Sequence, residues 1–174
     1  DNGWVMQEGN WQGGIVALQC PMQRGYRKEM DEIIEKYAKM IYRIAYIYLK
    51  SKVDAEDIVQ DVFEKYVKHN KSFKDENHRK NWILQVTVHL CINLKKSAWK
   101  RKVVPLVDDT LVLDTEEQYK ILDELDSLSE KYRMVVQLFY FEDLSVEDIS
   151  KALKISESNV KTRLNRARNE LKTK

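Results

Sequence analysis

The chain has 174 residues, of which 43% are hydrophobic and 33% are charged, and its formal net charge is +2. This is enough for one ordinary domain or two small ones, so we expect a folded protein. Its two cysteines, Cys20 and Cys91, show no CxxC spacing and no matching histidine cluster, which argues against a zinc site or a disulfide framework. We expect no metal and no cofactor. No run approaches 18 apolar residues, so we expect a cytoplasmic protein with no membrane insertion.

Helix breakers are concentrated at the start of the chain. All five glycines lie within the first 25 residues, and Pro105 is the only proline beyond that point. The rest is rich in Leu, Lys, Glu, Ile and Val, which favours an all-α fold. Residues 1–27 show no clear period, and we interpret them as an N-terminal extension of unknown role.

Three helices are expected in a first domain, residues 28–102. Apolar positions repeat at helical spacing from Glu29 to about Lys50. The segment DAEDIVQDVFEKYVK follows, with Asp54 expected as its N-cap. A polar loop, SFKDENHRKN, precedes the run WILQVTVHLCINLKKSAWKRK. Its Val-Thr-Val triplet suits a strand, but the run is too long for an ordinary strand and lacks turn signals, so we predict a helix.

An acidic segment then separates this domain from a second one. Residues 103–117, VVPLVDDTLVLDTEE, contain Pro105 and five acids without a helical period, which indicates a flexible linker. The second domain, residues 118–174, should contain a helix around Leu125, another over 129–141 and two short capped helices. The first of these is SVEDISKALK, with Ser145 as its N-cap, and the second begins after Ser156.

The last two helices form the pattern of a helix-turn-helix. They are joined by a short break at KIS, and the second, SESNVKTRLNRARNELK, is basic with an apolar row at steps of four, three and four. In this motif the second helix enters the DNA major groove. The residues expected to contact base edges and phosphates are Ser158, Lys161, Thr162, Arg163, Asn165 and Arg166.

Two long segments resemble bacterial sigma factors of the extracytoplasmic-function (ECF) group of the sigma-70 family. AYIYLKSKVDAEDIVQDVFEKYVK, followed by SFKDENHRKNWILQVTV, looks like their region 2. LDSLSEKYRMVVQLFYFEDLSVEDISKALKISESNVKTRLNRARNELK looks like their region 4. The resemblance covers about residues 30–174 and implies a sigma factor without catalytic residues. Such a protein binds core RNA polymerase and promoter DNA and is commonly held by a separate anti-sigma factor.

The resemblance also implies roles for individual residues. The helix DAEDIVQDVF would bind the polymerase largest subunit through Asp57, Gln60 and Asp61. The loop KDENHRK and the following helix would capture bases of the melted minus-10 element. The residues implied for minus-10 DNA are Asn77, His78, Arg79, Lys80, His89, Lys95 and Lys96. Many relatives carry Asn at the position of His89, so this residue either reads DNA or is structural.

Two other interpretations fit parts of the pattern. The acids Asp54, Glu56, Asp57 and Asp61 could form a magnesium site of a helical enzyme, but a second acidic motif and a Gly-rich phosphate loop are missing. The chain could also be a helix-turn-helix regulator with a helical sensor domain. That protein would bind duplex DNA by itself, without polymerase docking.

Overall fold

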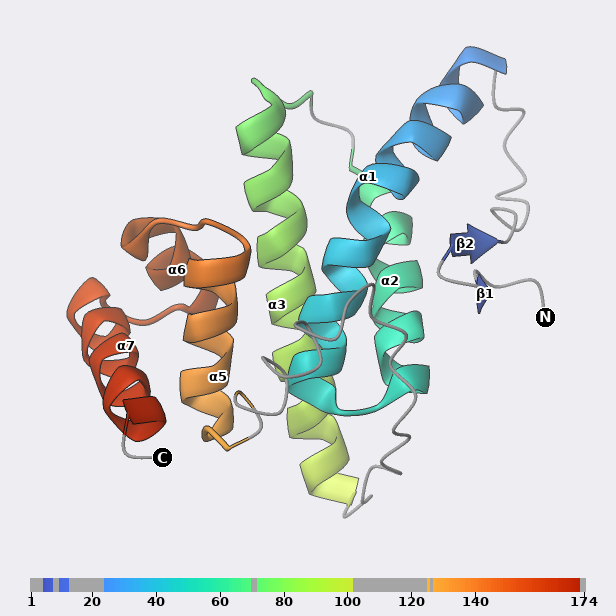
Figure 1. Ribbon diagram of the computed structural model, residues 1–174. Helices are drawn as coiled ribbons and strands as arrows, with labels where there is room; N and C mark the ends of the chain where they lie inside the picture. The colour runs from blue at the N-terminus through green and yellow to red at the C-terminus, as the bar shows by residue number, and fades with distance from the viewer. Residues whose placement is uncertain are drawn as a thin grey trace.

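The computed structural model describes residues 5–7, 10–12, 24–69, 72–101, 125 and 127–172. Figure 1 shows a helical body and a small hairpin. The hairpin pairs β1 (Val5–Gln7) with β2 (Asn10–Gln12), antiparallel. The helices are α1 (Arg24–Leu49), α2 (Lys52–Val67), α3 (Glu76–Arg101), α5 (Glu130–Val136), the π-helix η1 (Gln137–Phe141), α6 (Val146–Leu153) and α7 (Glu157–Lys172).

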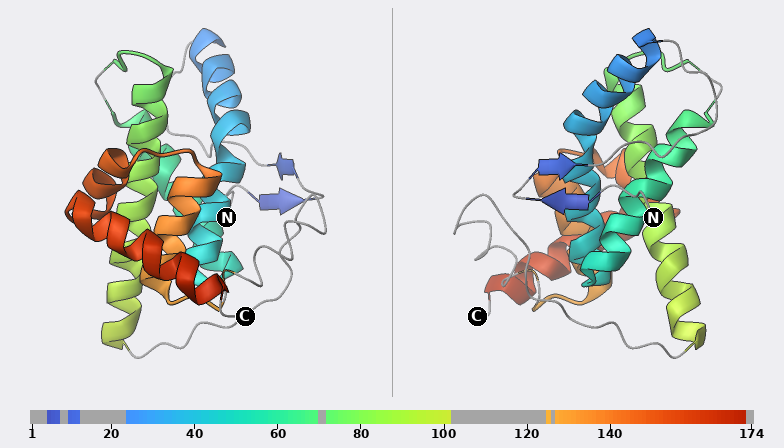
Figure 2. Two further views of the ribbon diagram at one scale, coloured as in Figure 1. Left: turned by 60° about the vertical axis from the view of Figure 1, so that its left-hand side comes forward. Right: turned by 90° about the vertical axis from the view of Figure 1, so that its right-hand side faces the viewer.

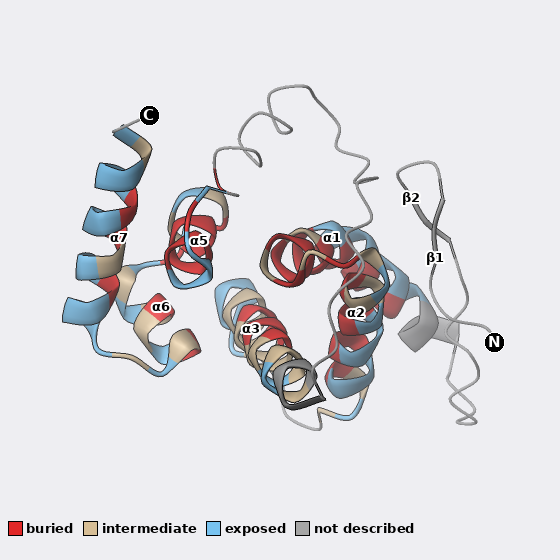
Figure 3. Cartoon of the chain, turned by 90° about the horizontal axis from the view of Figure 1, so that it is seen from below, coloured by how far each residue is buried: buried red, intermediate tan, exposed pale blue. Residues whose placement is uncertain are grey.

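Helices α1, α2 and α3 pack together as the first bundle. Their buried faces turn toward one another, as the view from below shows (Figure 3). On α1, Ile41, Ile44 and Ala45 are fully buried, and Ile58 and Val62 of α2 meet them. These positions follow the helical period read from the sequence, so the predicted helical bundle is confirmed.

The start of α2 differs from the prediction. Ser51, not Asp54, is the N-cap: its backbone is extended, and its Oγ accepts a hydrogen bond of 3.2 Å from the Asp54 backbone N–H. The helix therefore begins one turn earlier than expected. Asp54 lies in the first turn, where a carboxylate is stabilised by the positive end of the helix dipole.

Helix α3 is a single helix, which confirms the choice of helix over strand for its Val-Thr-Val triplet. Thr87 is fully buried, yet its hydroxyl is satisfied by donating to the Ile83 carbonyl at 2.8 Å. The β-branched triplet is therefore tolerated by packing and by this local bond. Helix α3 begins at Glu76, so residues expected in a polar loop form its first turns.

The second helical unit comprises α5, η1, α6 and α7. Helix α5 continues directly into η1 along the predicted 129–141 segment, and Tyr132, Val135 and Val136 are buried. In Figure 2 this unit lies in front of the first bundle in the left view and behind it in the right view. The linker expected at 103–117 lies outside the described residues, as does most of the helix expected around Leu125.

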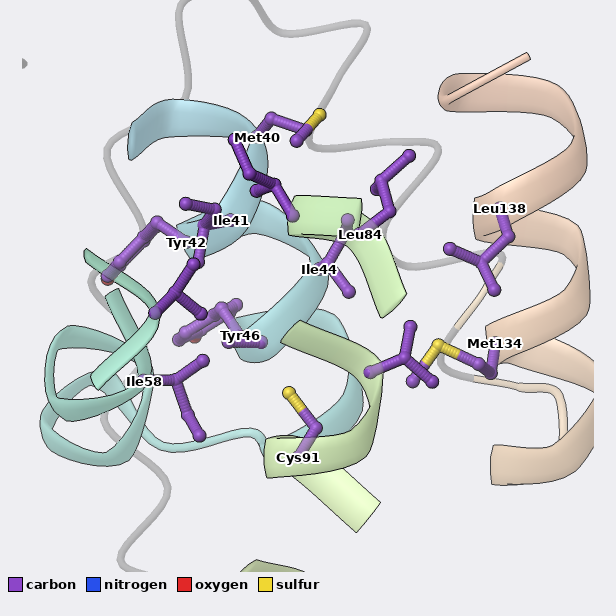
Figure 4. Packing of buried hydrophobic residues seen from close by; sticks show 14 of the residues in the cluster. Met40, Ile41, Tyr42, Ile44, Tyr46, Ile58, Leu84, Cys91, Met134 and Leu138 are labelled. Carbon is purple, nitrogen blue, oxygen red and sulfur yellow. The ribbon is translucent and has the colours of Figure 1, made fainter. Parts of the chain in front are cut away.

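The two units share one continuous apolar cluster. Ile44 of α1 and Leu84 of α3 point toward Met134 and Leu138 of α5 and η1 (Figure 4). Met134 and Leu138 are at most 3% exposed. The helical units are therefore packed against each other along α1 and α3.

Candidate DNA-binding and polymerase-binding surfaces

Helices α6 and α7 form the predicted helix-turn-helix. Ser145 caps α6, with its Oγ accepting from the Asp148 backbone N–H at 3.0 Å. Lys154 ends α6 in the left-handed conformation, φ 54°, which turns the chain sharply. Ser156 then caps α7, accepting from the Asn159 backbone N–H at 3.3 Å. The two caps predicted from the sequence are confirmed, and together with the turn they fix the orientation of α7.

The cap of α6 makes a measurable contribution to stability. We expect Ser145→Ala to destabilise the chain by about 1 kcal/mol, because the orphan N–H of Asp148 loses its partner. For a chain of this length, this lowers the melting temperature by about 2–4 °C, measured by circular dichroism. Ser129→Ala is a matched control, since Ser129 stands at the N-cap of α5 without a capping side-chain bond. An equal loss in both variants contradicts the assignment.

Helix α7 presents one buried row and one exposed face. Val160, Leu164 and Ala167 are at most 3% exposed and attach the helix to the rest of its unit. Of the residues expected to contact DNA, Arg163 is half-buried and the others are exposed: Ser158, Lys161, Thr162, Asn165 and Arg166. The exposed face lies on the outside of the molecule in Figure 3. The structure thus brings these residues together on one accessible helix face.

Hydrogen bonds within α7 order part of this face. The Thr162 hydroxyl donates to the Ser158 carbonyl at 2.8 Å, and Arg163 Nε donates to Asn159 Oδ1 at 2.8 Å. Within the described part of the chain, Lys161 and Arg166 have no such partner. Their cationic groups are therefore available to an anionic or hydrogen-bonding ligand in front of α7.

Arg168 lies on a different face of α7 and packs within its own domain. Its Nε donates to the Tyr140 hydroxyl at 2.8 Å, and its guanidinium carbon lies 5.8 Å from the ring centroid. A basic helix alone gives no sign of this contact, because its partner is 28 residues away in the chain. Arg168 thus supports the fold of the unit.

Asp57, Gln60 and Asp61 form an exposed face on α2, while Ile58 and Val62 of the same helix point into the core. Partial burial raises the pKa of Asp57, and the neighbouring Asp54 and Asp61 raise it further. Burial and the nearby Glu64 likewise raise the pKa of Asp61. The face concentrates negative charge, which favours a cationic partner.

Six of the seven residues expected to contact minus-10 DNA divide into two groups on α3, and Lys96 lies apart from both. Asn77, His78 and Arg79 lie in its first turn, where the His78 backbone N–H donates to Asp75 Oδ1 at 2.7 Å. The His78 ring belongs to a group of aromatic rings at this end of the helix. The other members are Tyr66, His69, Phe73 and Trp82. Trp82 is half-buried within this group and packs on the core. Lys96 is exposed farther along the helix.

Lys80, His89 and Lys95 form the second group and face the other helical unit. Lys80 Nζ donates to the Glu142 carbonyl at 2.9 Å, and Lys95 forms an ion pair with Glu130. His89 Nε2 is buried without a hydrogen-bond partner among the described residues. Burial and the charge of nearby Lys154 lower the His89 pKa. The seven residues therefore do not share one open surface in this arrangement.

Two buried charged residues between the units escaped sequence analysis. Arg133 donates to the carbonyls of Leu125, Leu128 and, from the first bundle, Ile47. Glu142 accepts from Arg43 Nη2 at 2.7 Å and is only 3% exposed. The sequence predicts that Glu142, which is followed by a second acid, lies on the surface. Its burial becomes visible only in the folded structure.

Neither a metal site nor a membrane helix is found in the described ranges. No group of three or more His, Cys, Asp or Glu side chains there could hold a metal ion, the α2 acids included. None of the helices in these ranges is both long and apolar enough to cross a membrane.

A helical fold with an exposed basic helix-turn-helix is typical of DNA-binding transcription factors. Residues 33–101 match the family described as Sigma-70 region 2, and residues 118–171 match Sigma-70, region 4. The chain belongs to the sigma-70 family of RNA polymerase sigma factors, in the ECF group. It directs RNA polymerase to promoters and acts in transcription initiation.

Similar proteins span most of the chain. The RNA polymerase sigma factor SigV of Bacillus subtilis is 30% identical over 141 residues, which cover 77% of this chain and 83% of SigV. The ECF sigma factor SigM of the same organism is 30% identical over 154 residues, 82% of this chain and 93% of SigM. Among solved structures, the sigma factor RpoE of Bartonella quintana, in complex with the anti-sigma factor NepR, has a TM-score of 0.66 at 20% identity. That match covers 84% of this chain and 96% of RpoE.

Proposed function

We propose that the chain docks on core RNA polymerase through the exposed α2 face and reads the minus-35 element through α7. The observation that carries this proposal is the exposed face of α7, where Lys161, Asn165 and Arg166 stand on a helix fixed by two caps. Arg and Asn side chains are suited to base edges in the major groove, and Lys to phosphates. This geometry supports the proposed DNA contacts.

The acidic face of α2 supports the docking role. Asp57, Gln60 and Asp61 are exposed on the side of α2 opposite its buried row. A carboxylate pair of raised pKa gains from a cationic partner, which relieves the repulsion between the acids. We propose the first turn of α3 as the accessible part of the minus-10 surface: Asn77 and His78 are exposed there, while Arg79 is half-buried and paired with Glu76 at 2.8 Å. Flipped bases would stack on the neighbouring aromatic rings.

The remaining parts of the proposal follow from this role. The chain itself carries no catalytic residue, because the chemistry belongs to the polymerase, and it acts in the cytoplasm where the polymerase works. The domains extend over 28–102 and 118–174, bounds that contain both family matches. A separate anti-sigma factor is a further partner, as the complexes of RpoE with NepR and of CnrH with CnrY suggest.

Direct binding measurements test the docking proposal. A fluorescently labelled full-length chain is titrated with core polymerase and, separately, with promoter duplex alone. We expect saturable binding to the polymerase and weak binding to the duplex. Tight, sequence-specific binding to the duplex without any affinity for the polymerase would instead support a helix-turn-helix regulator.

Phosphate contacts by α7 predict a defined response to salt. For the complex of polymerase, this chain and promoter DNA, affinity falls as salt concentration rises. The slope of log affinity against log salt should become less steep by about 1 with Lys161→Ala. Lys151→Ala is the control, because Lys151 is an exposed lysine of α6 paired with Glu147 at 2.6 Å. It should leave the slope unchanged. Identical slopes for Lys161→Ala and the unsubstituted chain contradict a phosphate contact.

A further inference from the structure

Glu76 is the first residue of α3, and its side chain reaches back to α1. Its Oε1 accepts hydrogen bonds from the Tyr37 hydroxyl and from Lys36 Nζ, the latter at 2.6 Å. Its Oε2 accepts from Arg79 Nη1 of the same helix at 2.8 Å. Both helices begin at the upper end of the bundle in Figure 1. One carboxylate therefore joins α1 to the beginning of α3.

Tyr37 is the stronger part of this contact. The ion pair with Lys36 is exposed, and exposed pairs stabilise a fold little. Tyr37, by contrast, is only 3% exposed, so its hydroxyl depends on a protein acceptor in place of water. Burial and the hydrogen bond to Glu76 raise the pKa of Tyr37, which keeps the hydroxyl protonated as a donor. Hydrogen bonds from Lys36 and Tyr37 lower the pKa of Glu76, which keeps the carboxylate ionised as the acceptor.

The first turn of α3 depends on polar contacts for its position. Asn77 and His78 are exposed, and the first fully buried side chain of α3 is Ile83. The His78 backbone N–H donates to Asp75 Oδ1 at 2.7 Å, which shapes the turn locally. A bond between near neighbours does not fix the turn relative to α1. The carboxylate of Glu76 supplies that long-range connection.

We infer that Glu76 is a positioning residue, which holds the first turn of α3 against α1 so that Asn77 and His78 are presented outward to melted minus-10 bases. Groups that are already ordered lose less conformational entropy when a ligand binds, so a fixed turn raises affinity without a contact of its own to DNA. Glu76 is acidic and repels DNA phosphates, which fits an indirect role. The minus-10 part rests on the proposed function, whereas the fixing of the turn does not.

Hydrogen exchange followed by mass spectrometry tests the fixed turn in the full chain, without DNA or polymerase. Glu76→Ala and Tyr37→Phe remove the contact from opposite sides, and each should speed the exchange of residues 74–80 several-fold. Glu76→Gln keeps an oxygen that accepts from the Tyr37 hydroxyl, so its exchange should stay close to that of the unsubstituted chain. Tyr48→Phe is the matched control, because it removes the hydroxyl of a half-buried tyrosine near the end of the same helix. It should leave the exchange of this segment unchanged.

Two results overturn the fixed turn. One is unchanged exchange of residues 74–80 in both Glu76→Ala and Tyr37→Phe. The other is exchange that speeds up equally in α2 and in the rest of the chain, because this indicates a general loss of stability. Having two variants keeps the test decisive even if one of them fails to fold.

DNA binding by the complex of the chain with core polymerase tests the minus-10 part. The probe is a short, fluorescently labelled single strand from the minus-10 region of a promoter from which the chain initiates in vitro. Glu76→Ala and Tyr37→Phe should weaken its binding several-fold, and Glu76→Gln should restore most of the affinity, although both Glu76 variants remove the same negative charge. Tighter binding by both Glu76 variants overturns the inference, because the charge alone then decides.

A double alanine substitution of Asn77 and His78 separates this inference from the proposed function. If the double variant binds the probe as tightly as the unsubstituted chain, the proposed minus-10 role of the turn fails and the DNA part of the inference fails with it. Hydrogen exchange still decides whether Glu76 fixes the turn. If the double variant binds weakly while Glu76→Ala and Tyr37→Phe bind normally, the minus-10 role stands and the positioning role is overturned.

Discussion

Asp61→Asn is expected to reduce binding to core RNA polymerase by about tenfold or more, while leaving the protein as stable as before or slightly more stable. Losing one partner of a desolvated charge pair costs roughly 2–5 kcal/mol, and each 1.4 kcal/mol is tenfold. Burial and Glu64 raise the pKa of Asp61, so the folded chain disfavours its ionised form. The amide removes this unfavourable charge without changing the shape. Polymerase titration and thermal unfolding measure the two effects.

The pH dependence of stability follows from the same pKa shift. For a carboxyl whose pKa is raised on folding, the penalty is absent below the unfolded pKa and fully present above the folded pKa. Any stability gain of Asp61→Asn should therefore appear at neutral pH and vanish in acid. A gain that grows as the pH falls contradicts this assignment.

Asp54→Asn is the control for docking, because its expected effects on stability and on polymerase binding are the reverse of those of Asp61→Asn. It removes the same charge from the same helix, but Asp54 lies in the first turn of α2, where its charge complements the helix dipole. We expect a small loss of stability, about 0.3–1 kcal/mol, and unchanged polymerase binding. Equal losses of binding in both variants would mean that the net charge of α2 matters and that no specific docking face exists.

Arg166→Ala is expected to weaken recognition of the minus-35 element without unfolding the protein. The side chain is exposed on the outer face of α7, away from the row formed by Val160, Leu164 and Ala167. A bidentate arginine contact to a base contributes roughly 1–3 kcal/mol, or about 5- to 150-fold in affinity. A promoter footprint with the polymerase present should therefore lose its upstream part.

Arg168→Ala provides a matched comparison two residues away. Arg168 bonds the Tyr140 hydroxyl at 2.8 Å, so its loss should lower stability by about 1 kcal/mol and leave the footprint intact. An unchanged footprint in Arg166→Ala, or a footprint lost in Arg168→Ala instead, contradicts the assignment of the recognition face.

Local features of the fold were readable from the sequence. The helix-turn-helix is set by short-range signals: Ser145 and Ser156 as caps, a break between them and an apolar row at helical spacing. The start of α2 was misread because Ser51 and Asp54 are both good N-cap residues three positions apart. The sequence alone did not decide which of these two residues caps the helix. The apolar row that follows Asp54 does not resolve such a choice.

Contacts between the helical units could not be predicted, because they depend on how two separately folded segments meet. Lys80 and Lys95 read as free cations, but their acceptors lie 62 and 35 residues away in the chain. Likewise, Glu142 resembles its neighbour Asp143, which is exposed, although the carboxylate of Glu142 is buried against Arg43. Burial of such charges becomes visible only once α1, α3 and α5 are placed together.

The most direct measurement is transcription in vitro with purified core polymerase and a pool of genomic promoter fragments, with and without the full chain. We predict specific initiation only when the chain is added, lost with Asp61→Asn and retained with Asp54→Asn. Initiation that is independent of the chain, together with specific binding of duplex DNA by the chain alone, would contradict a sigma factor that acts through docking on the polymerase.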